Sequence, residues 1–158
     1  MKILIVSDTH AQVRPLVSLI DRYVNDVQMV IHLGDHARDL LDIETNYPSL
    51  TMVAVAGNTD YYGERERVLS LEGRRVLLLH GDRRDVNSGM DRLFYYAKDK
   101  GVDVCLFGHT HIQAQFIKES IFFMNPGSVS LPRGGSNAGY GMIEITPEGE
   151  ITGELLPL

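Results

Sequence analysis

The chain has 158 residues, of which 44% are hydrophobic and 23% are charged, and its formal net charge is -6. This is the composition of an ordinary globular protein, and it excludes disordered, collagen-like and fibrous chains. A pI of about 5.4 argues against a broad basic surface for nucleic acid. No apolar run approaches the roughly 20 residues that cross a bilayer, and the apolar part of the opening MKILIVSDTH is too short for a secretory signal. We therefore expect a cytoplasmic protein with no membrane partner and no stable nucleic-acid partner.

The first two thirds of the chain alternate between strand and helix patterns. The β-branched run 2–6 predicts a buried strand, and apolar residues at three- and four-residue steps predict a helix over 15–27. The remaining expected elements are a strand at 29–33, a helix at 38–47, a strand at 50–56, a hairpin of strands at 67–71 and 74–79, a helix at 90–98 and a strand at 102–107. Pro48 ends the second helix, and Glu72-Gly73 forms the hairpin turn.

After residue 107 only strand patterns continue. Short strands are expected at 112–118, 121–124, 141–145 and 151–155, separated by Glu-Ser, Asn-Pro-Gly and Pro-Glu-Gly turns. We expect these four strands to form an antiparallel meander. The chain shows no linker and no repeat, so residues 1–158 are predicted to be a single domain of the α/β (α+β) class, with two packed β-sheets and helices outside.

Five of the apolar strand runs end in polar residues suited to chemistry. They lead in chain order into SDTH (7–10), GD (34–35), GNTD (57–60), HG (80–81) and GHTH (108–111). In α/β sheets, ligands gather beyond the carboxyl ends of the strands. Each motif is weak alone, but their repetition at five strand ends is a strong signal. The candidate ligands are Asp8, His10, Asp35, Asn58, His80, His109 and His111.

The types and spacing of these residues indicate a metal site. In an extended segment, residues two apart point to the same side, so Asp8 with His10, and His109 with His111, can each face one cavity. Oxygen donors mixed with imidazole, and without thiolate, suit Mn, Fe, Zn, Co or Ni better than a calcium cage. Seven donors are too many for one tetrahedral ion but enough for two, if a carboxylate bridges. Two ions about 3.5–4 Å apart can hold both the attacking and the leaving oxygen of a phosphoryl displacement.

The motifs DTH, GD, GNTD, HG and GHTH, in this order, resemble the calcineurin-like metallophosphoesterase superfamily. The tail NPGSVSLPRGG, followed by YGMIEI, resembles the small single-domain bacterial and archaeal phosphodiesterases of the YfcE type within it. The resemblance spans essentially the whole chain. It implies a sandwich of two mixed sheets flanked by helices, and a metal-dependent phosphodiesterase that hydrolyses a small or nucleotide-like phosphodiester.

The resemblance also implies how the ligands are shared between two divalent transition-metal ions. Mn²⁺ is the first choice, with Ni²⁺, Zn²⁺, Fe²⁺ or Co²⁺ as alternatives. One ion is held by Asp8, His10, Asp35 and His111, and the other by Asp35, Asn58, His80 and His109. Asp35 bridges the ions, a bridging hydroxide attacks phosphorus, and catalysis involves Asp35, Asn58 and His109. Relatives of this type form dimers or tetramers, so we expect a homo-oligomer.

The sequence departs from the wider superfamily at Thr59. Many members have a histidine directly after Gly-Asn, and that histidine is usually assigned to protonating the leaving group. General acid help is worth typically ~10²–10⁴-fold, so we predict that esters with acidic leaving groups are cleaved far better than simple alkyl esters. The YfcE-type branch commonly shares the form without histidine, so the change does not by itself mean an inactive enzyme.

Several residues near the motifs have two interpretations. Asp60 either orients a metal-bound histidine, which we favour, or caps the next segment. Asn125 and Ser128 either border the cavity or only form a tight turn, and Arg133 stands in a loop that reaches substrate. For Thr59 we consider a place beside the metal site or the substrate.

Other residues have a structural interpretation as the default. His32 is read as a core or surface residue, and Arg83 and Arg84 as a solvated turn that could also hold phosphate oxygens. Four tyrosines could stack on a base or line an oligomer interface, with core packing as the default: Tyr61, Tyr62, Tyr95 and Tyr96.

Two other functions compete with the phosphodiesterase. A phosphomonoesterase of the same fold is one. The other is a metal-binding protein-interaction module, because the family includes a retromer subunit that uses the fold chiefly as an interaction surface. A module that had left catalysis behind is expected to lose ligands, and all seven positions are filled here. The sequence therefore favours an enzyme.

Overall fold

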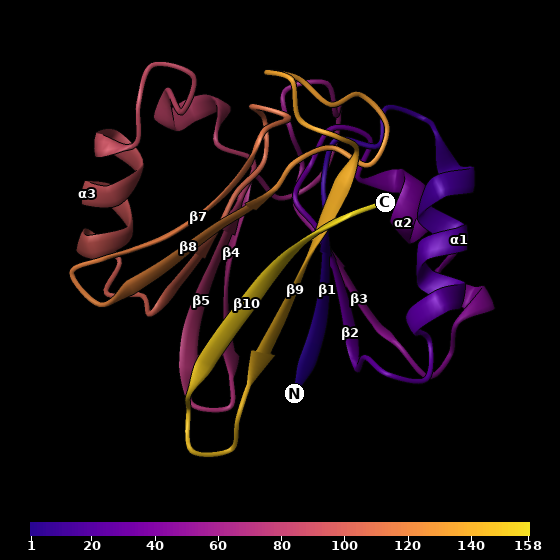
Figure 1. Cartoon of the computed structure of the whole chain (residues 1–158), viewed down its shortest axis with the longest axis horizontal. Coiled ribbons are helices and arrows are strands. Elements are labelled where there is room, and N and C mark those ends of the chain that lie inside the picture. Colours follow the sequence, from indigo (N-terminus) through magenta and orange to yellow (C-terminus); the bar gives the residue numbers. More distant parts are fainter.

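The computed structural model describes all of residues 1–158 and has two five-stranded β-sheets packed face to face (Figure 1). Sheet A has the order β10-β9-β1-β2-β3, from β1 (Lys2–Val6), β2 (Met29–His32), β3 (Thr51–Ala54), β9 (Gly139–Ile145) and β10 (Ile151–Pro157). Sheet B has the order β4-β5-β6-β8-β7, from β4 (Glu66–Leu71), β5 (Arg74–Leu79), β6 (Val104–Leu106), β7 (Gln113–Lys118) and β8 (Ile121–Pro126). The helices are α1 (Val13–Tyr23), α2 (Arg38–Leu41) and α3 (Asp91–Asp99), with 3₁₀ turns at Glu44–Asn46 and Asp82–Arg84.

The layers follow from the hydrophobic pattern of the strands. In β1, Ile3 and Ile5 join the apolar cluster between the two sheets, whereas Leu4 and Val6 join the cluster beneath α1 and α2. Because successive side chains of a strand point to opposite faces, a strand covered on both faces is apolar at every position. A third cluster joins sheet B to α3 through Leu93, Phe94 and Ala97, among others. The expected sandwich of two mixed sheets flanked by helices is confirmed.

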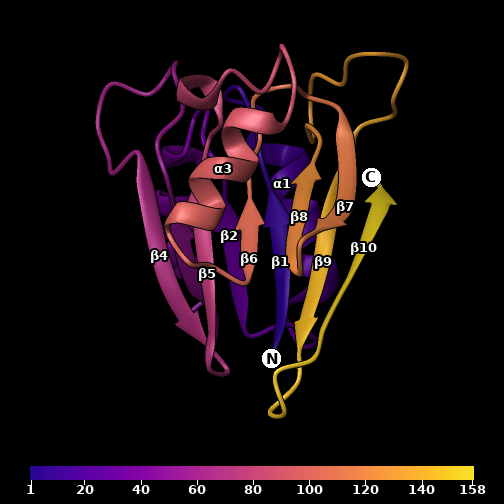
Figure 2. The same cartoon turned by 90° about the vertical axis from the view of Figure 1, so that its left-hand side faces the viewer.

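The strand directions bring the five motif-bearing ends together. β1, β2 and β3 run parallel in sheet A, and β5 and β6 run parallel in sheet B. Figure 2 shows β1 and β6 pointing toward the same end of the molecule. The loops that follow these five strands therefore meet at one edge of the sandwich.

The expected C-terminal meander is wrong. β7 and β8 form a hairpin in sheet B, while β9 and β10 form a hairpin in sheet A, where β9 pairs with β1. The segment 127–138 carries the chain from one sheet to the other (Figure 2). The alternation of apolar residues defines a strand but not its partner, and here Ile143 and Ile145 are buried by pairing beside β1.

Two helices differ from their expected bounds. The expected helix 15–27 begins at Val13, because Pro15 is tolerated in a first turn whose N–H groups have no partner inside the helix, and it ends at Tyr23. The expected helix 38–47 is only the single turn α2, followed by the 3₁₀ turn Glu44–Asn46. Thr45 and Asn46 are poor helix formers, and the chain turns so that the buried Tyr47 donates a hydrogen bond to Asp21 Oδ1 at 2.8 Å.

The expected hairpin between β4 and β5 is confirmed. Glu72 and Gly73 both have positive φ, at 47° and 74°, as a two-residue hairpin turn of type I′ requires. In the whole chain, no helix is long and apolar enough to span a lipid bilayer.

Candidate metal centre

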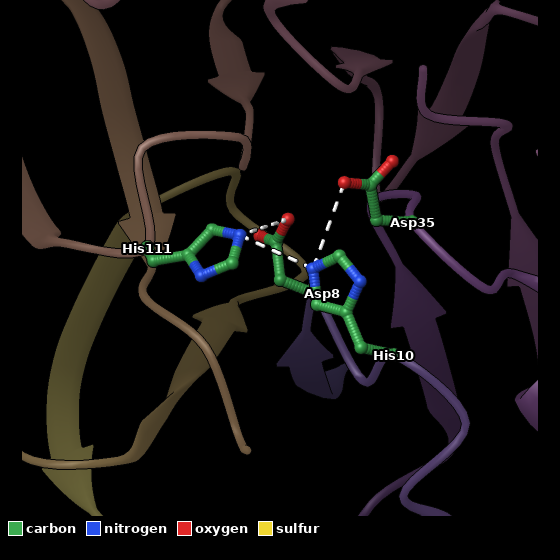
Figure 3. Close-up of side chains that lie close together, drawn as sticks. All are labelled: Asp8, His10, Asp35 and His111. Carbon is green, nitrogen blue, oxygen red and sulfur yellow. Dashed lines mark hydrogen bonds and ion pairs between the residues drawn. The ribbon is translucent and has the colours of Figure 1, made fainter. Parts of the chain in front are cut away.

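Carboxylate and imidazole side chains gather where β1, β2 and β6 end (Figure 3). Asp8, His10, Asp35 and His111 each offer one donor atom, and these atoms all lie within 4.8 Å of one another. All are buried except His10, which is half-buried. The four residues come from three separate loops, so the fold, and not local sequence, assembles this cluster.

Within this first set, the nitrogen lone pairs converge. The Nδ1 atom of His111 donates to the carbonyl oxygen of Leu131 at 2.6 Å, which turns Nε2 toward the cluster. That Nε2 lies 3.2 Å from His10 Nε2 and 3.2 Å from Asp8 Oδ1. Two imidazole nitrogens and a carboxylate oxygen at these distances attract one another only when a proton or a cation lies between them.

A second set of donors lies on the other side of Asp35. The Nε2 atom of the fully buried His80 is 3.3 Å from Asp35 Oδ1, 3.1 Å from Asn58 Oδ1 and 3.2 Å from His109 Nδ1. His80 Nδ1 donates to the carbonyl oxygen of Leu33 at 2.7 Å, which aims Nε2 at these atoms. The other oxygen of Asp35, Oδ2, lies 3.7 Å from His10 Nε2. The two oxygens of Asp35 therefore face two different donor sets.

The site contains an orphaned buried oxygen. Asp8 Oδ1 is buried and has no hydrogen-bond partner, while Oδ2 accepts from the backbone N–H of His109 at 3.2 Å. Nearly all buried polar atoms in proteins are satisfied. A cation beside Asp8 Oδ1 would satisfy it, so the residues present fit divalent transition-metal ions.

The protonation of the site points the same way. Burial favours the neutral form of Asp35, but the hydrogen bond to His80 and the charge of that ring outweigh it and hold the pKa of Asp35 well below its usual range. Burial likewise disfavours protonation of His80 and His111, yet the neighbouring carboxylates of Asp35 and Asp8, respectively, raise the pKa of each ring. Protons on these rings occupy positions that a cation would take, so metal binding releases protons.

The ligand loops bend through strained backbone conformations. Non-glycine residues with positive φ include five of the seven predicted ligands: Asp8, His10, Asp35, His109 and His111. Each such residue costs of order 1–3 kcal/mol, and the strain turns the chain sharply back at the strand ends. Gly108 allows two of these loops to touch, because a Cβ there would collide with the Ser7 hydroxyl and lie 2.9 Å from Asp8 Oδ2.

Thr59 and Asp60 support the second donor set through backbone contacts. The N–H of Thr59 donates to Asp35 Oδ1 at 3.0 Å. The carboxylate of Asp60 accepts from the N–H groups of Gly57 at 2.8 Å and Ala37 at 3.0 Å. The favoured role of Asp60, orienting a metal-bound histidine, is not what the structure shows. Its carboxylate instead joins the loops that follow β2 and β3.

Asn125 and Ser128 hold the ligand loops from behind. Asn125 is buried and donates to the carbonyl oxygen of Gly108 at 2.8 Å, and the hydroxyl of Ser128 donates to the carbonyl oxygen of Asp8 at 2.7 Å. Arg133 is exposed, and its backbone N–H donates to the carbonyl oxygen of His111 at 3.2 Å. The loop 127–138 thus supports the first donor set through the main chain.

A buried polar network near the site has no signal in the sequence. His32 Nε2 lies 3.0 Å from the hydroxyl of Thr9, which donates to Asp39 Oδ2 at 2.5 Å. Asp39 also accepts from the N–H of Ala11 at 3.0 Å, and burial lowers the pKa of His32 to about 4. His32 is therefore a neutral core residue, as expected, and it also ties β2 to the loop that carries two predicted ligands.

Asn87 is a second residue that the sequence did not reveal, because it stands in no motif. Its side-chain Nδ2 lies 2.9 Å from His109 Nε2.

The arginine and tyrosine residues singled out in the sequence differ in whether their side chains are already engaged in contacts. Arg84 pairs with Glu66 at 3.5 Å and lies 3.5 Å over the ring of Tyr96, so these contacts already engage its side chain. Core packing is wrong for Tyr61, Tyr62 and Tyr95, which are 94%, 87% and 65% exposed. Tyr61 and Tyr62 stand in the loop between β3 and β4.

A surface groove lies away from these residues. It has a volume of about 550 Å³ and runs along Tyr23, Met142 and Leu156, between α1 and the hairpin of β9 and β10. It reaches Lys2, at the opposite end of β1 from Asp8, and contains none of the predicted ligands. The convergent donors, and not this groove, define the candidate site.

The fold and the donor set define a class of protein, and comparison with known proteins identifies it. The chain matches the calcineurin-like phosphoesterase superfamily domain over residues 1–148, and it belongs to this family. The probable metallophosphoesterase YsnB of Bacillus subtilis (strain 168) is 32% identical over 148 residues, which are 92% of this chain and 85% of that protein. The phosphodiesterase YfcE of Escherichia coli (strain K12) is 28% identical over 169 residues, covering 91% of this chain and 88% of that protein. The family resemblance seen in the sequence is confirmed.

Solved structures agree. A predicted phosphoesterase from Streptococcus pneumoniae TIGR4 superposes with a TM-score of 0.79 at 31% identity, covering 92% of this chain and 83% of the other. Vps29 from Entamoeba histolytica, crystallised with Zn²⁺, has the same fold at a TM-score of 0.77 and 23% identity, covering 98% and 97%. The chain is thus a member of a metallophosphoesterase family, and its group of potential metal ligands fits that family.

Proposed function

We propose that this chain is a metal-dependent phosphodiesterase that hydrolyses a small or nucleotide-like phosphodiester at a dinuclear centre. One observation carries the proposal: the two oxygens of Asp35 face two separate donor sets, one around His10 and the other around His80. A single ion would leave one of these sets unused. The relationship to the phosphodiesterase YfcE supports the choice of diester.

In this proposal Asp8, His10, Asp35 and His111 hold one ion, and Asp35, Asn58, His80 and His109 hold the other. Divalent ions, when bound, supply a polarised water as nucleophile and positive charge for the phosphoryl oxygens. Mixed nitrogen and oxygen donors suit divalent transition metals as a group, and within it we propose Mn²⁺, with Ni²⁺, Zn²⁺, Fe²⁺ or Co²⁺ as alternatives. Asp8 and Asp35 bring only two negative charges against the four positive charges of two divalent ions. The site therefore keeps a net positive charge that complements the single negative charge of a phosphodiester.

The residues around the site fix the ligands and do little proton transfer themselves. The N–H of Thr59 donates to Asp35, and the carbonyl oxygens of Leu33 and Leu131 hold the rings of His80 and His111. The hydroxyl of Thr59 is a poor acid compared with an imidazolium. The leaving group consequently departs without protonation by the protein, so the rate depends on the acidity of the departing alcohol or phenol.

The test compares an aryl phosphodiester with the matching monoester, using metal-stripped protein with and without added Mn²⁺. We expect metal-restored hydrolysis of the diester and little hydrolysis of the monoester. Preference for the monoester would instead identify a phosphomonoesterase. Inactivity on both, with two ions bound, would contradict an enzyme and favour an interaction module on this fold.

A further inference from the structure

Three of the four histidines in the two donor sets, His80, His109 and His111, are held in two different ways. The outer Nδ1 atoms of His80 and His111 each donate to a backbone carbonyl oxygen, at 2.7 Å and 2.6 Å. The ring of His109 is turned the other way, with Nδ1 inward, 3.2 Å from His80 Nε2. Its outer Nε2 lies 2.9 Å from Nδ2 of the Asn87 side chain. A side-chain amide therefore stands where the other two rings have a carbonyl of the main chain.

The difference has a chemical consequence. A backbone carbonyl only accepts, so it locks a neutral imidazole with its proton on the outer nitrogen and its lone pair inward. A side-chain amide has both a donor and an acceptor end, so it can satisfy either tautomer of the ring it faces. With its Nδ2 toward Nε2, as in the structure, Asn87 favours the tautomer of His109 that carries the proton on Nδ1.

We propose that Asn87 is a positioning residue: its amide holds the outer Nε2 of His109 in either tautomer of the ring, and it thereby raises the affinity of the second metal position. With Nδ1 protonated, the amide NH₂ donates to Nε2. With Nδ1 bound to a cation, the amide turns over and its oxygen accepts from Nε2–H. The ring loses one proton at Nδ1 and gains one at Nε2 through water, so its charge is unchanged. This inference rests on the dinuclear centre proposed above.

The loop around Asn87 is built to present this side chain. Asn87 follows Val86, whose side chain is buried in the cluster beneath α3. One residue further on, the Ser88 hydroxyl donates to Asp85 Oδ1 at 2.8 Å. Anchors on both sides thus fix the backbone of Asn87 although its side chain is exposed. Because the position is exposed, substitutions there leave the core intact.

Three variants separate this role from a merely structural one. Asn87→Leu removes both the donor and the acceptor of the amide. It should lower the affinity for one of the two Mn²⁺ ions by about 10–100-fold, the range for residues that orient metal ligands. Asn87→Asp keeps only the acceptor end and should bind that ion at least as tightly as the unmodified protein. Arg83→Gln makes the same change of one charge unit in the exposed segment before Asn87, without touching Asn87 or its anchors, and should change neither affinity by more than about twofold. Calorimetric titration of metal-stripped protein with Mn²⁺ measures all four proteins.

A second readout needs no metal. Nitrogen-15 spectra of the metal-free protein should show the His109 proton on Nδ1 in the unmodified chain and on Nε2 in Asn87→Asp. The same tautomer in both proteins, or unchanged Mn²⁺ affinities in Asn87→Leu, would overturn the role of Asn87. If the unmodified chain binds only one ion, the dinuclear proposal fails instead, and the spectra still decide the role of Asn87.

Discussion

At the scale of single residues, the site depends on how Asp35 is shared. Its Oδ2 faces His10 and its Oδ1 faces His80, and the N–H of Thr59 fixes the carboxylate between them. Gly57 makes room for this arrangement, because a Cβ there would collide with Asp35. Residues of this kind affect both halves of a site, whereas His109 belongs to one half.

Substitution of Asp35 therefore has a distinctive expected result. Asp35→Ala should lower the affinity for both ions by more than about 100-fold. Loss of a residue that only hydrogen-bonds to a metal ligand already lowers metal affinity by about 10–100-fold. His109→Ala should weaken one ion and spare the other. Metal content and Mn²⁺ titrations of the two variants measure this difference. Full loading of Asp35→Ala with two ions would contradict the bridging role.

Thr59 predicts a dependence on the leaving group. Without a histidine after Asn58, the rate should rise steeply with the acidity of the alcohol or phenol that departs. Thr59→His should raise the rate on alkyl diesters by up to about 100-fold and change aryl diesters little, because only poor leaving groups need an acid. Rates on a series of esters with chemistry as the slow step test this. Equal rates on aryl and alkyl esters in the unmodified protein would refute it.

His32 predicts a pH dependence of stability in the metal-free protein. Its pKa falls from 6.5 to about 4 on folding because the ring is buried. Between these two pKa values, His32 is protonated in the unfolded chain but not in the folded protein. Its contribution to the free energy of unfolding therefore declines as the pH falls. The loss is about 2 kcal/mol between pH 7.5 and pH 5.

The measurement is urea unfolding at both pH values. His32→Asn is expected to be less stable at pH 7.5 but to lose about 2 kcal/mol less on acidification than the unmodified protein. The other histidines titrate in both proteins, so their effect cancels in the difference between the two losses of stability. An equal loss in both would show that His32 does not carry this dependence.

At the scale of elements, the loop between β3 and β4 carries two exposed tyrosines, for which we predict a contact with substrate. It stands at the same end of the molecule as the ligand loops (Figure 2). Its base is held by Asp60 and by Arg65, which donates to the carbonyl oxygens of Gly57 and Asp60. Tyr61 follows Asn58 by three residues, a reach of at most about 11 Å. An anchored loop thus presents exposed aromatic rings near the metal ligands.

Replacement of Tyr61 and Tyr62 by alanine should accordingly raise the KM for an aryl or nucleoside diester about 5–100-fold, because stacking on an aromatic ring is worth about 1–3 kcal/mol. A methyl ester with the same leaving group should be unaffected. Tyr95→Ala, an exposed tyrosine on α3, is the matched control. An unchanged KM together with a smaller oligomer in sedimentation would assign the two rings to an interface between copies of the chain.

At the scale of the whole molecule, the proposed dinuclear centre would couple metal binding to folding. Its proposed ligands come from loops after five strands of two sheets, so the complete set is assembled only when both sheets are formed. A ligand that binds only the folded state at 100 times its Kd stabilises a protein by about 2.7 kcal/mol.

Saturation with Mn²⁺ should therefore raise the Tm of the metal-stripped protein by about 5–10 °C for each ion bound. Asp35→Ala should show little of this increase. Thermal unfolding followed by circular dichroism, with and without Mn²⁺, measures it. A comparable increase in Asp35→Ala would place the stabilising ions elsewhere on the molecule.

The candidate residues of the site could be predicted from local sequence patterns. Asp8, Asp35 and the GHTH motif could be recognised because each follows an apolar strand, and the hydrophobic pattern of a strand is a local property. For the same reason the alternation of strands and helices up to residue 107 agrees with the structure, apart from helix bounds. The turn at Glu72-Gly73 also follows from local chemistry, since only a few residue pairs suit it.

The spatial arrangement of these parts, by contrast, depends on contacts between segments that are far apart in the chain. The partner of β9 is β1, more than 130 residues away, and no local pattern encodes that pairing. The tautomers of His80 and His111 are set by backbone carbonyls of Leu33 and Leu131, which any residue type at those positions would supply. Asn87 meets His109 only because a loop of sheet B folds over the site. Local composition fixes which groups are available, whereas packing of distant strands fixes which atoms face one another.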